Sequence, residues 1–184
     1  MESFNNIEFF IYESNVMIKF VNGEVKQLKE SDIMLINFVL DMIQTYYPKA
    51  YHALAEEYKA CRGNVLYFNY RVVLRFIKCN YAALDNMPDI EDDLLGRFEY
   101  VPCPLRGECK HECVICRPEF DSELSEAEKR VMRRWKDNEA VEEIADALYL
   151  SPHTVNNHIR HSYKKLGVHS KSEFIVVAEK YKFL

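Results

Sequence analysis

Glycine and proline are scarce in this chain of 184 residues, which has only 5 of the first and 6 of the second. These residues supply most tight turns and helix ends, so their scarcity leaves little room for loops and predicts a mostly helical protein. Apolar residues make up 48% and aromatic residues 13%. That content suffices for a packed core and excludes a disordered chain.

Long apolar runs are also missing. The longest, such as IMLINFVL, fall far short of the roughly 20 residues that a membrane-spanning helix needs. The opening residues MESFNN lack the basic start and apolar core of a signal peptide. We therefore expect a cytoplasmic protein without a membrane partner, whose cysteines stay reduced.

The first 85 residues predict a small β-structure followed by helices. Residues 7–12 and 16–21 are rich in β-branched and aromatic side chains, and Asn22–Gly23 tolerates the positive φ of a hairpin turn. Three apolar helical stretches follow. They span residues 31–47, capped by Ser31, residues 48–63, ending at Gly63, and residues 64–81.

No phosphate loop, dinucleotide fingerprint or catalytic grouping stands out in this region, so an enzyme is not expected. We interpret residues 1–85 as a module that binds a signal ligand or a protein partner. The proline-containing acidic stretch at 86–100 is interpreted as a linker or as the start of a solvated helix.

Four cysteines lie close together within residues 101–120, at Cys103, Cys109, Cys113 and Cys116. Their spacing, C-x5-C-x3-C-x2-C, predicts a structural zinc site, since four thiolates complete a tetrahedral shell and His111 is a spare ligand. An iron–sulfur cluster and metal-free thiols, reduced or paired, are the alternatives.

The other two cysteines, Cys61 and Cys79, fall in apolar helical patterns and are interpreted as core residues.

Charge is distributed unevenly along the chain. Residues 124–184 hold 11 basic and 9 acidic residues, whereas the rest holds 13 basic and 20 acidic residues. Only the C-terminal third therefore has a basic bias, which permits a polyanionic partner there.

The C-terminal sixty residues carry consecutive helix signals. Ser125 and Glu128 form a capping box, and Asn138 is a residue that tolerates a left-handed stop. A short helix follows, and a third begins at Ser151 and ends at Gly167.

The third helix is amphipathic. Its polar side carries Asn156, Asn157, Arg160 and Lys164. Amides pair with adenine, guanidinium groups with guanine, and lysines with phosphates. Two consecutive helices, the second of which exposes polar side chains that can contact DNA, match the helix-turn-helix arrangement.

The segments LSEAEKRVMRRW, EEIADALYLSPHTVNNHI and KKLGVHSKSEF together resemble a LuxR-type (GerE-like) helix-turn-helix domain. The resemblance covers about a third of the chain and implies a four-helix domain at 121–184. It implies base contacts by Asn156, Asn157 and Arg160, and phosphate contacts by Thr154, Lys164 and Lys165. Ala140 departs from the family, which has a hydroxyl residue near this position.

The last helix has five consecutive apolar residues, 174–178. One side of such a helix is left exposed in a monomer, so we expect a homodimer through residues 170–181, as the resemblance also implies. Two copies would place their recognition helices about 34 Å apart on DNA.

The chain is thus expected to be mostly α with a small N-terminal β-hairpin or sheet. Its expected function is that of a dimeric, sequence-specific transcriptional regulator that binds double-stranded DNA and has a structural metal segment. The alternative is a metal or iron–sulfur redox sensor whose helical domain serves as a protein-interaction adaptor.

Overall fold

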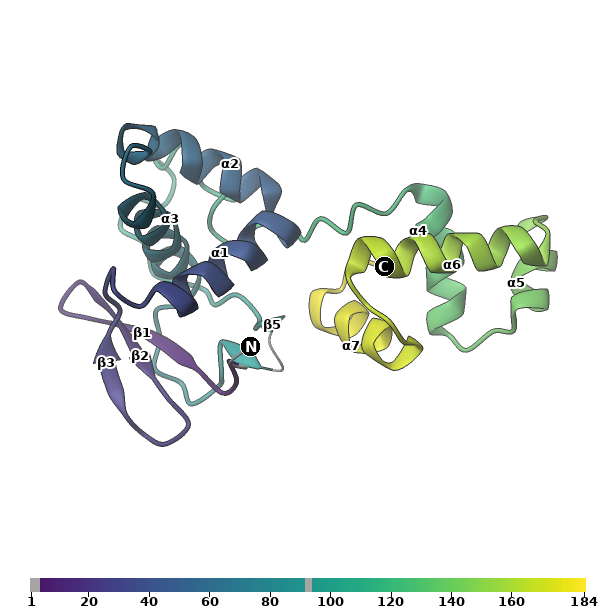
Figure 1. Cartoon of the computed structure of the whole chain (residues 1–184), viewed down its shortest axis with the longest axis horizontal. Coiled ribbons are helices and arrows are strands. Elements are labelled where there is room, and N and C mark those ends of the chain that lie inside the picture. The colour runs from purple at the N-terminus through teal and green to yellow at the C-terminus, as the bar shows by residue number, and fades with distance from the viewer. Residues whose placement is uncertain (1–3, 92–93) are drawn as a thin grey trace. The chain divides into compact units, whose positions relative to one another are not determined.

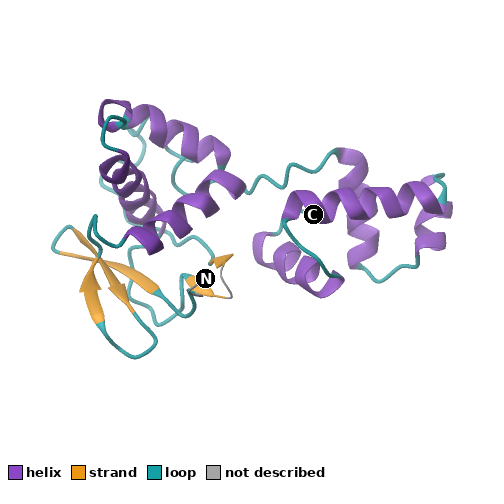
Figure 2. Cartoon of the chain, in the orientation of Figure 1, coloured by secondary structure: helices purple, strands orange, loops and turns teal. Residues whose placement is uncertain are grey.

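The computed structural model describes residues 4–91 and 94–184. The chain divides into two compact units, Met1–Glu119 and Phe120–Leu184. Helices predominate, with a small antiparallel sheet near the N-terminus (Figures 1 and 2), which confirms the predicted fold class. No helix among the described residues combines the length and apolar character needed to cross a bilayer.

The sheet has the strand order β1-β2-β3, formed by Glu8–Tyr12, Asn15–Lys19 and Val25–Gln27. Phe9 pairs with Ile18 across the first two strands, and both side chains are fully buried. The second turn contains Gly23 with φ of 81°, a conformation that glycine adopts without steric cost. The Asn22–Gly23 turn thus connects β2 to β3, as predicted.

Three helices follow the sheet, α1 (Ile33–Tyr46), α2 (Pro48–Glu57) and α3 (Val65–Asn80). Two of their boundaries differ from the predicted ones. The N-cap of α1 is Asp32 and not Ser31. Helix α2 ends at Glu57, six residues before Gly63, and a short 3-10 helix, Lys59–Cys61, follows it. The Asp32 carboxylate accepts a hydrogen bond from the Lys29 amide at 2.8 Å, which holds the turn that precedes α1.

The acidic stretch 86–100 is not a linker, contrary to expectation, because its described part packs into the N-terminal unit. Strands β4 (Ile90–Glu91) and β5 (Leu94–Leu95) pair with each other, and Ile90 also bridges to Ile7. Asp89 is buried and accepts a 2.6 Å hydrogen bond from the Phe9 amide, and burial raises the pKa of its carboxyl to about 8. Ile90 and Leu95 of the stretch are fully buried, and this burial outweighs its acidic composition.

The C-terminal unit consists of four helices, α4 (Glu126–Lys136), α5 (Val141–Leu148), α6 (Pro152–Leu166) and α7 (Lys171–Tyr181). Helix α6 packs against both α4 and α5 (Figure 1). The core consists of apolar side chains that recur at helical spacing: Val131, Met132, Ile144, Ala145, Val155, Ile159, Leu166 and Phe174.

Candidate nucleic-acid interface

A three-residue turn joins α5 to α6. Tyr149 has the left-handed conformation, with φ of 55° and ψ of 43°, and the Leu150 amide closes the turn on the Ala145 carbonyl at 2.9 Å. Ser151 then caps α6 by accepting a hydrogen bond from the Thr154 amide at 3.1 Å, as predicted. The turn and the cap therefore set the direction in which α6 leaves α5.

Helix α4 is attached to α6 through two side-chain contacts. The Trp135 indole donates a 3.0 Å hydrogen bond to the Tyr163 hydroxyl. Lys165 reaches back to the buried Glu128 carboxylate at 2.7 Å, and Glu128 also closes the predicted capping box with Ser125. These contacts fix the buried side of α6, and thereby the orientation of its opposite side.

The exposed side of α6 presents Asn156, Arg160 and Lys164, which lie one helical turn apart and line one open groove. Arg160 Nη2 donates a 2.9 Å hydrogen bond to Asn157 Oδ1, which holds the guanidinium group along the helix. Three of the predicted base-contacting and phosphate-contacting side chains are therefore exposed together, with Asn157 half-buried beside them.

Two predicted phosphate contacts have other partners. Thr154 is half-buried, and its hydroxyl lies 2.8 Å from the Ser151 hydroxyl at the start of α6. Lys165 is committed to the ion pair with Glu128. The structure thus gives both residues a role in holding α6, and their contact with phosphate remains a prediction.

One exposed side chain was missed by sequence reasoning. Tyr149 is 96% exposed in the turn before α6, where its hydroxyl is available to a phosphate. The left-handed backbone at Tyr149 exposes its side chain, and no sequence motif marks a tyrosine in this conformation. The sequence therefore did not indicate that Tyr149 is exposed beside α6.

A short helix, a tight turn and a second helix with a polar exposed side define a helix-turn-helix unit, the class of domain that inserts its second helix into the major groove of DNA. Residues 122–178, about a third of the chain, match the GerE family, described as bacterial regulatory proteins of the luxR family. These residues therefore form a LuxR-type helix-turn-helix domain, the DNA-binding module of a family of regulatory proteins. Comparison with curated proteins and with solved structures yielded no match.

The apolar row on α7 divides between two sides of the helix. Phe174, Val177 and Ala178 are buried within the unit, Ile175 is half-buried, and Val176 is 49% exposed. Helical spacing explains the division, because residues three and four positions apart share one side. The exposed part is therefore smaller than five consecutive apolar residues suggest.

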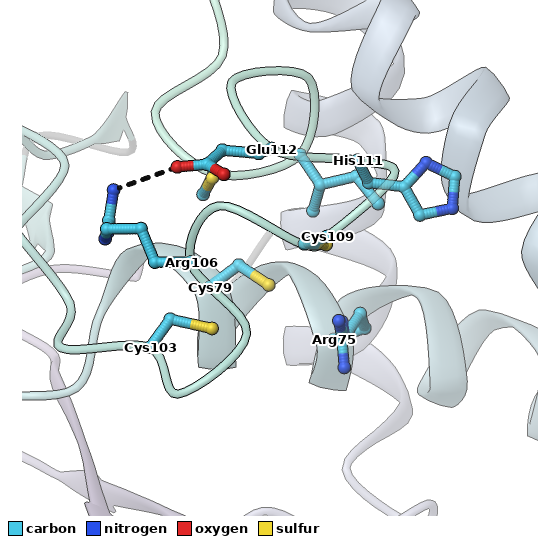
Figure 3. A pocket seen from close by; sticks show the side chains of 9 residues that line it. Arg75, Cys79, Cys103, Arg106, Cys109, His111 and Glu112 are labelled. Carbon is cyan, nitrogen blue, oxygen red and sulfur yellow. Dashed lines mark ion pairs between the residues drawn. The ribbon is translucent and has the colours of Figure 1, made fainter.

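The cysteine segment surrounds a small cavity in the N-terminal unit (Figure 3). Cys103, Cys109 and Cys116 line the cavity, as predicted ligands should, but Cys113 is exposed and does not. Cys79 of α3, interpreted from the sequence as an ordinary core cysteine, is half-buried and lines the cavity instead. Burial raises the pKa of the Cys79 thiol.

No group of three or more His, Cys, Asp or Glu side chains within the described ranges is arranged to hold a metal ion as the side chains stand. His111, the spare ligand, has its Nε2 atom 3.1 Å from Glu57 Oε2 of α2. All six cysteines are free thiols. The predicted metal set of Cys103, Cys109, Cys113 and Cys116 thus stays a prediction.

The start of α5 lacks a side-chain cap, because Ala140 has no oxygen to accept from the first amides of the helix. Ala140→Ser is expected to stabilise the C-terminal unit by about 1 kcal/mol and to raise its melting temperature by about 4 to 8 °C. Fluorescence of Trp135, the single tryptophan of the chain, reports this transition.

The matched control for this substitution is Ala147→Ser, which places the same hydroxyl at an exposed position in the last turn of α5, away from its N-terminus. Serine has a lower helix propensity than alanine, so the control should lower the melting temperature slightly. Equal shifts in the two variants would contradict the capping argument.

Proposed function

We propose that this protein is a transcriptional regulator that recognises a specific duplex DNA sequence through α6. The observation that supports this most strongly is the exposed stripe of Asn156, Arg160 and Lys164 on a helix whose other side is held by the core. Within this stripe Arg160 bonds only to its neighbour Asn157 among the described contacts, so the exposed polar groups are available to a ligand of matching length.

The chemistry of the stripe favours base edges in its first two turns and backbone further along. The Asn156 amide can donate to and accept from adenine, and the Arg160 guanidinium can donate two hydrogen bonds to guanine. Lys164, two turns beyond Asn156, supplies a charge for a phosphate. We therefore assign sequence recognition to Asn156, Asn157 and Arg160, and backbone attraction to Lys164.

We further propose that the regulator binds as a homodimer through residues 170–181. The exposed Val176 and the half-buried Ile175 of α7 support a small apolar contact between two copies. Two copies related by a two-fold axis would present their α6 helices to half-sites about one DNA turn apart, roughly 34 Å. The N-terminal unit, with its cysteine segment holding a structural metal, would then receive a signal or a protein partner.

Selection of bound sequences from a random duplex pool tests recognition and dimerisation together. The selected sequences should contain two related half-sites about one turn apart, and binding should weaken as salt rises. Arg160→Ala should cost about 1 to 3 kcal/mol of binding free energy and relax the preference at one position of each half-site.

Arg133→Ala on α4 is the matched control, because it removes the same charge and side chain from an exposed position outside α6. It should leave the sequence preference unchanged. A wild-type protein that selects no sequence above the starting pool would refute the proposed function, and single half-sites would refute only the dimer.

A further inference from the structure

One cavity of about 30 Å³ is lined by four cysteines, three from a single short segment and one from a helix earlier in the chain. Cys79 belongs to the last turn of α3, whereas Cys103, Cys109 and Cys116 come from the segment 101–119 (Figure 3). The cavity volume corresponds to about one water-sized particle. It therefore suits a single ion better than an iron–sulfur cluster or an organic ligand.

Cys113 participates through its backbone and not through its sulfur. It has a left-handed φ of 58°, its side chain is exposed, and its amide donates a 3.3 Å hydrogen bond to the Cys116 sulfur. An N–H group directed at a sulfur favours the charged thiolate, which is the form that binds metals. The two-residue gap between Cys113 and Cys116 thus makes a turn that supports one sulfur.

Two guanidinium groups and one carboxylate, that of Glu112, line the same cavity. Arg75 of α3 and Arg106 both line it, and Arg106 is further held by an ion pair with Glu112 at 3.5 Å (Figure 3). Four thiolates on one divalent ion leave two negative formal charges, so nearby guanidinium groups stabilise the filled site.

We propose that Cys79, Cys103, Cys109 and Cys116 bind one zinc ion as four thiolate ligands. The ion would join the end of α3 to the segment 101–119, which contains no helix or strand among its residues. Only Ile115 and Pro118 of that segment are buried, so apolar burial contributes little to its order. Because the sulfurs line the cavity without yet converging on a common point, zinc must draw the segment inward and order it.

Zinc content and affinity of the full chain, purified under reducing and oxygen-free conditions with zinc and iron supplied, test the site. We expect one zinc per chain and no iron. Cys79→Ser should weaken zinc binding, which chelator competition measures. Removing a residue that only positions a ligand costs roughly 10- to 100-fold in metal affinity, and loss of a ligand should cost more than this. Cys61→Ser and Cys113→Ser are matched controls that should keep one zinc at unchanged affinity.

Cysteine alkylation followed by mass spectrometry tests the same site in the unaltered chain. With zinc bound, Cys79, Cys103, Cys109 and Cys116 should resist alkylation and become reactive when a chelator removes the ion. Cys113 should react in both states. This measurement keeps the proposal testable even where Cys79→Ser does not fold.

Three results would overturn the proposal. If Cys113→Ser lost zinc and Cys79→Ser kept it, the ligands would be the four cysteines predicted from the sequence, Cys103, Cys109, Cys113 and Cys116. A chain that contains iron with sulfide would show a cluster, and a chain that binds neither metal under these conditions would show that the cavity holds thiols alone.

Discussion

Replacing Asn80 with leucine is expected to destabilise the N-terminal unit by about 3 kcal/mol. Asn80 is fully buried at the end of α3, and its amide nitrogen donates to the Phe76 and Ile115 carbonyls at 2.9 Å each. Its carbonyl oxygen accepts from the Arg117 amide at 2.6 Å. Leucine has a similar volume but leaves the Ile115 carbonyl and the Arg117 amide without these partners, at a cost of about 1 to 3 kcal/mol for each group that stays buried.

Urea unfolding followed by hydrogen exchange of peptides from residues 65–80 measures this loss within the unit itself. Asn69→Leu is the matched control, because Asn69 lies on the same helix at a half-exposed position. It should change the free energy of unfolding by less than about 0.5 kcal/mol. An Asn80→Leu variant no less stable than this control would show that the three hydrogen bonds contribute nothing net.

The Asn80→Leu substitution should also affect metal binding. Asn80 follows Cys79 directly and binds the chain on both sides of Cys116, so it sets where the segment 101–119 lies against α3. The Asn80→Leu variant should therefore also bind zinc more weakly if Cys79 is a ligand.

The second large effect concerns pH and Glu128. Burial alone would raise the pKa of this carboxyl, but the hydrogen bonds from Lys165 and Ser125 outweigh burial and hold the pKa at about 2, below its usual 4.5. A carboxylate with a lowered folded-state pKa stabilises the fold above pH 4.5, and this contribution disappears as the pH falls toward 2. It amounts to about 2 to 3 kcal/mol for the C-terminal unit at neutral pH.

Glu128→Gln should therefore lose about 2 to 3 kcal/mol at pH 7 and show a flatter loss of stability between pH 5 and pH 2 than the wild type. Denaturant unfolding followed by Trp135 fluorescence at several pH values measures both effects. Glu126→Gln on the same helix is the control, since Glu126 is exposed and its ion pair with Lys129 lies at the surface. Parallel pH profiles for wild type and Glu128→Gln would contradict the argument.

Local signals in the sequence determined most of the C-terminal unit. The Ser125–Glu128 capping box, the left-handed Asn138 with φ of 64°, and the Ser151 and Gly167 ends of α6 all lie where the residues predict them. Each depends on hydrogen bonds or backbone preferences within a few residues, so the sequence alone carries the information. The polar side of α6 followed from the same helical periodicity.

Only the tertiary structure decided which distant residues meet. Cys79 and not Cys113 lines the cysteine cavity, Lys165 pairs with Glu128 across 37 positions, and the acidic stretch after residue 85 joins the N-terminal core. These outcomes depend on which side of α3, α4 and α6 is buried against which neighbour, a choice made by apolar packing over the whole unit. The spacing of residues along the chain predicts a set of metal ligands or a charged surface only where the fold brings no residue from a distant part of the sequence into the same site.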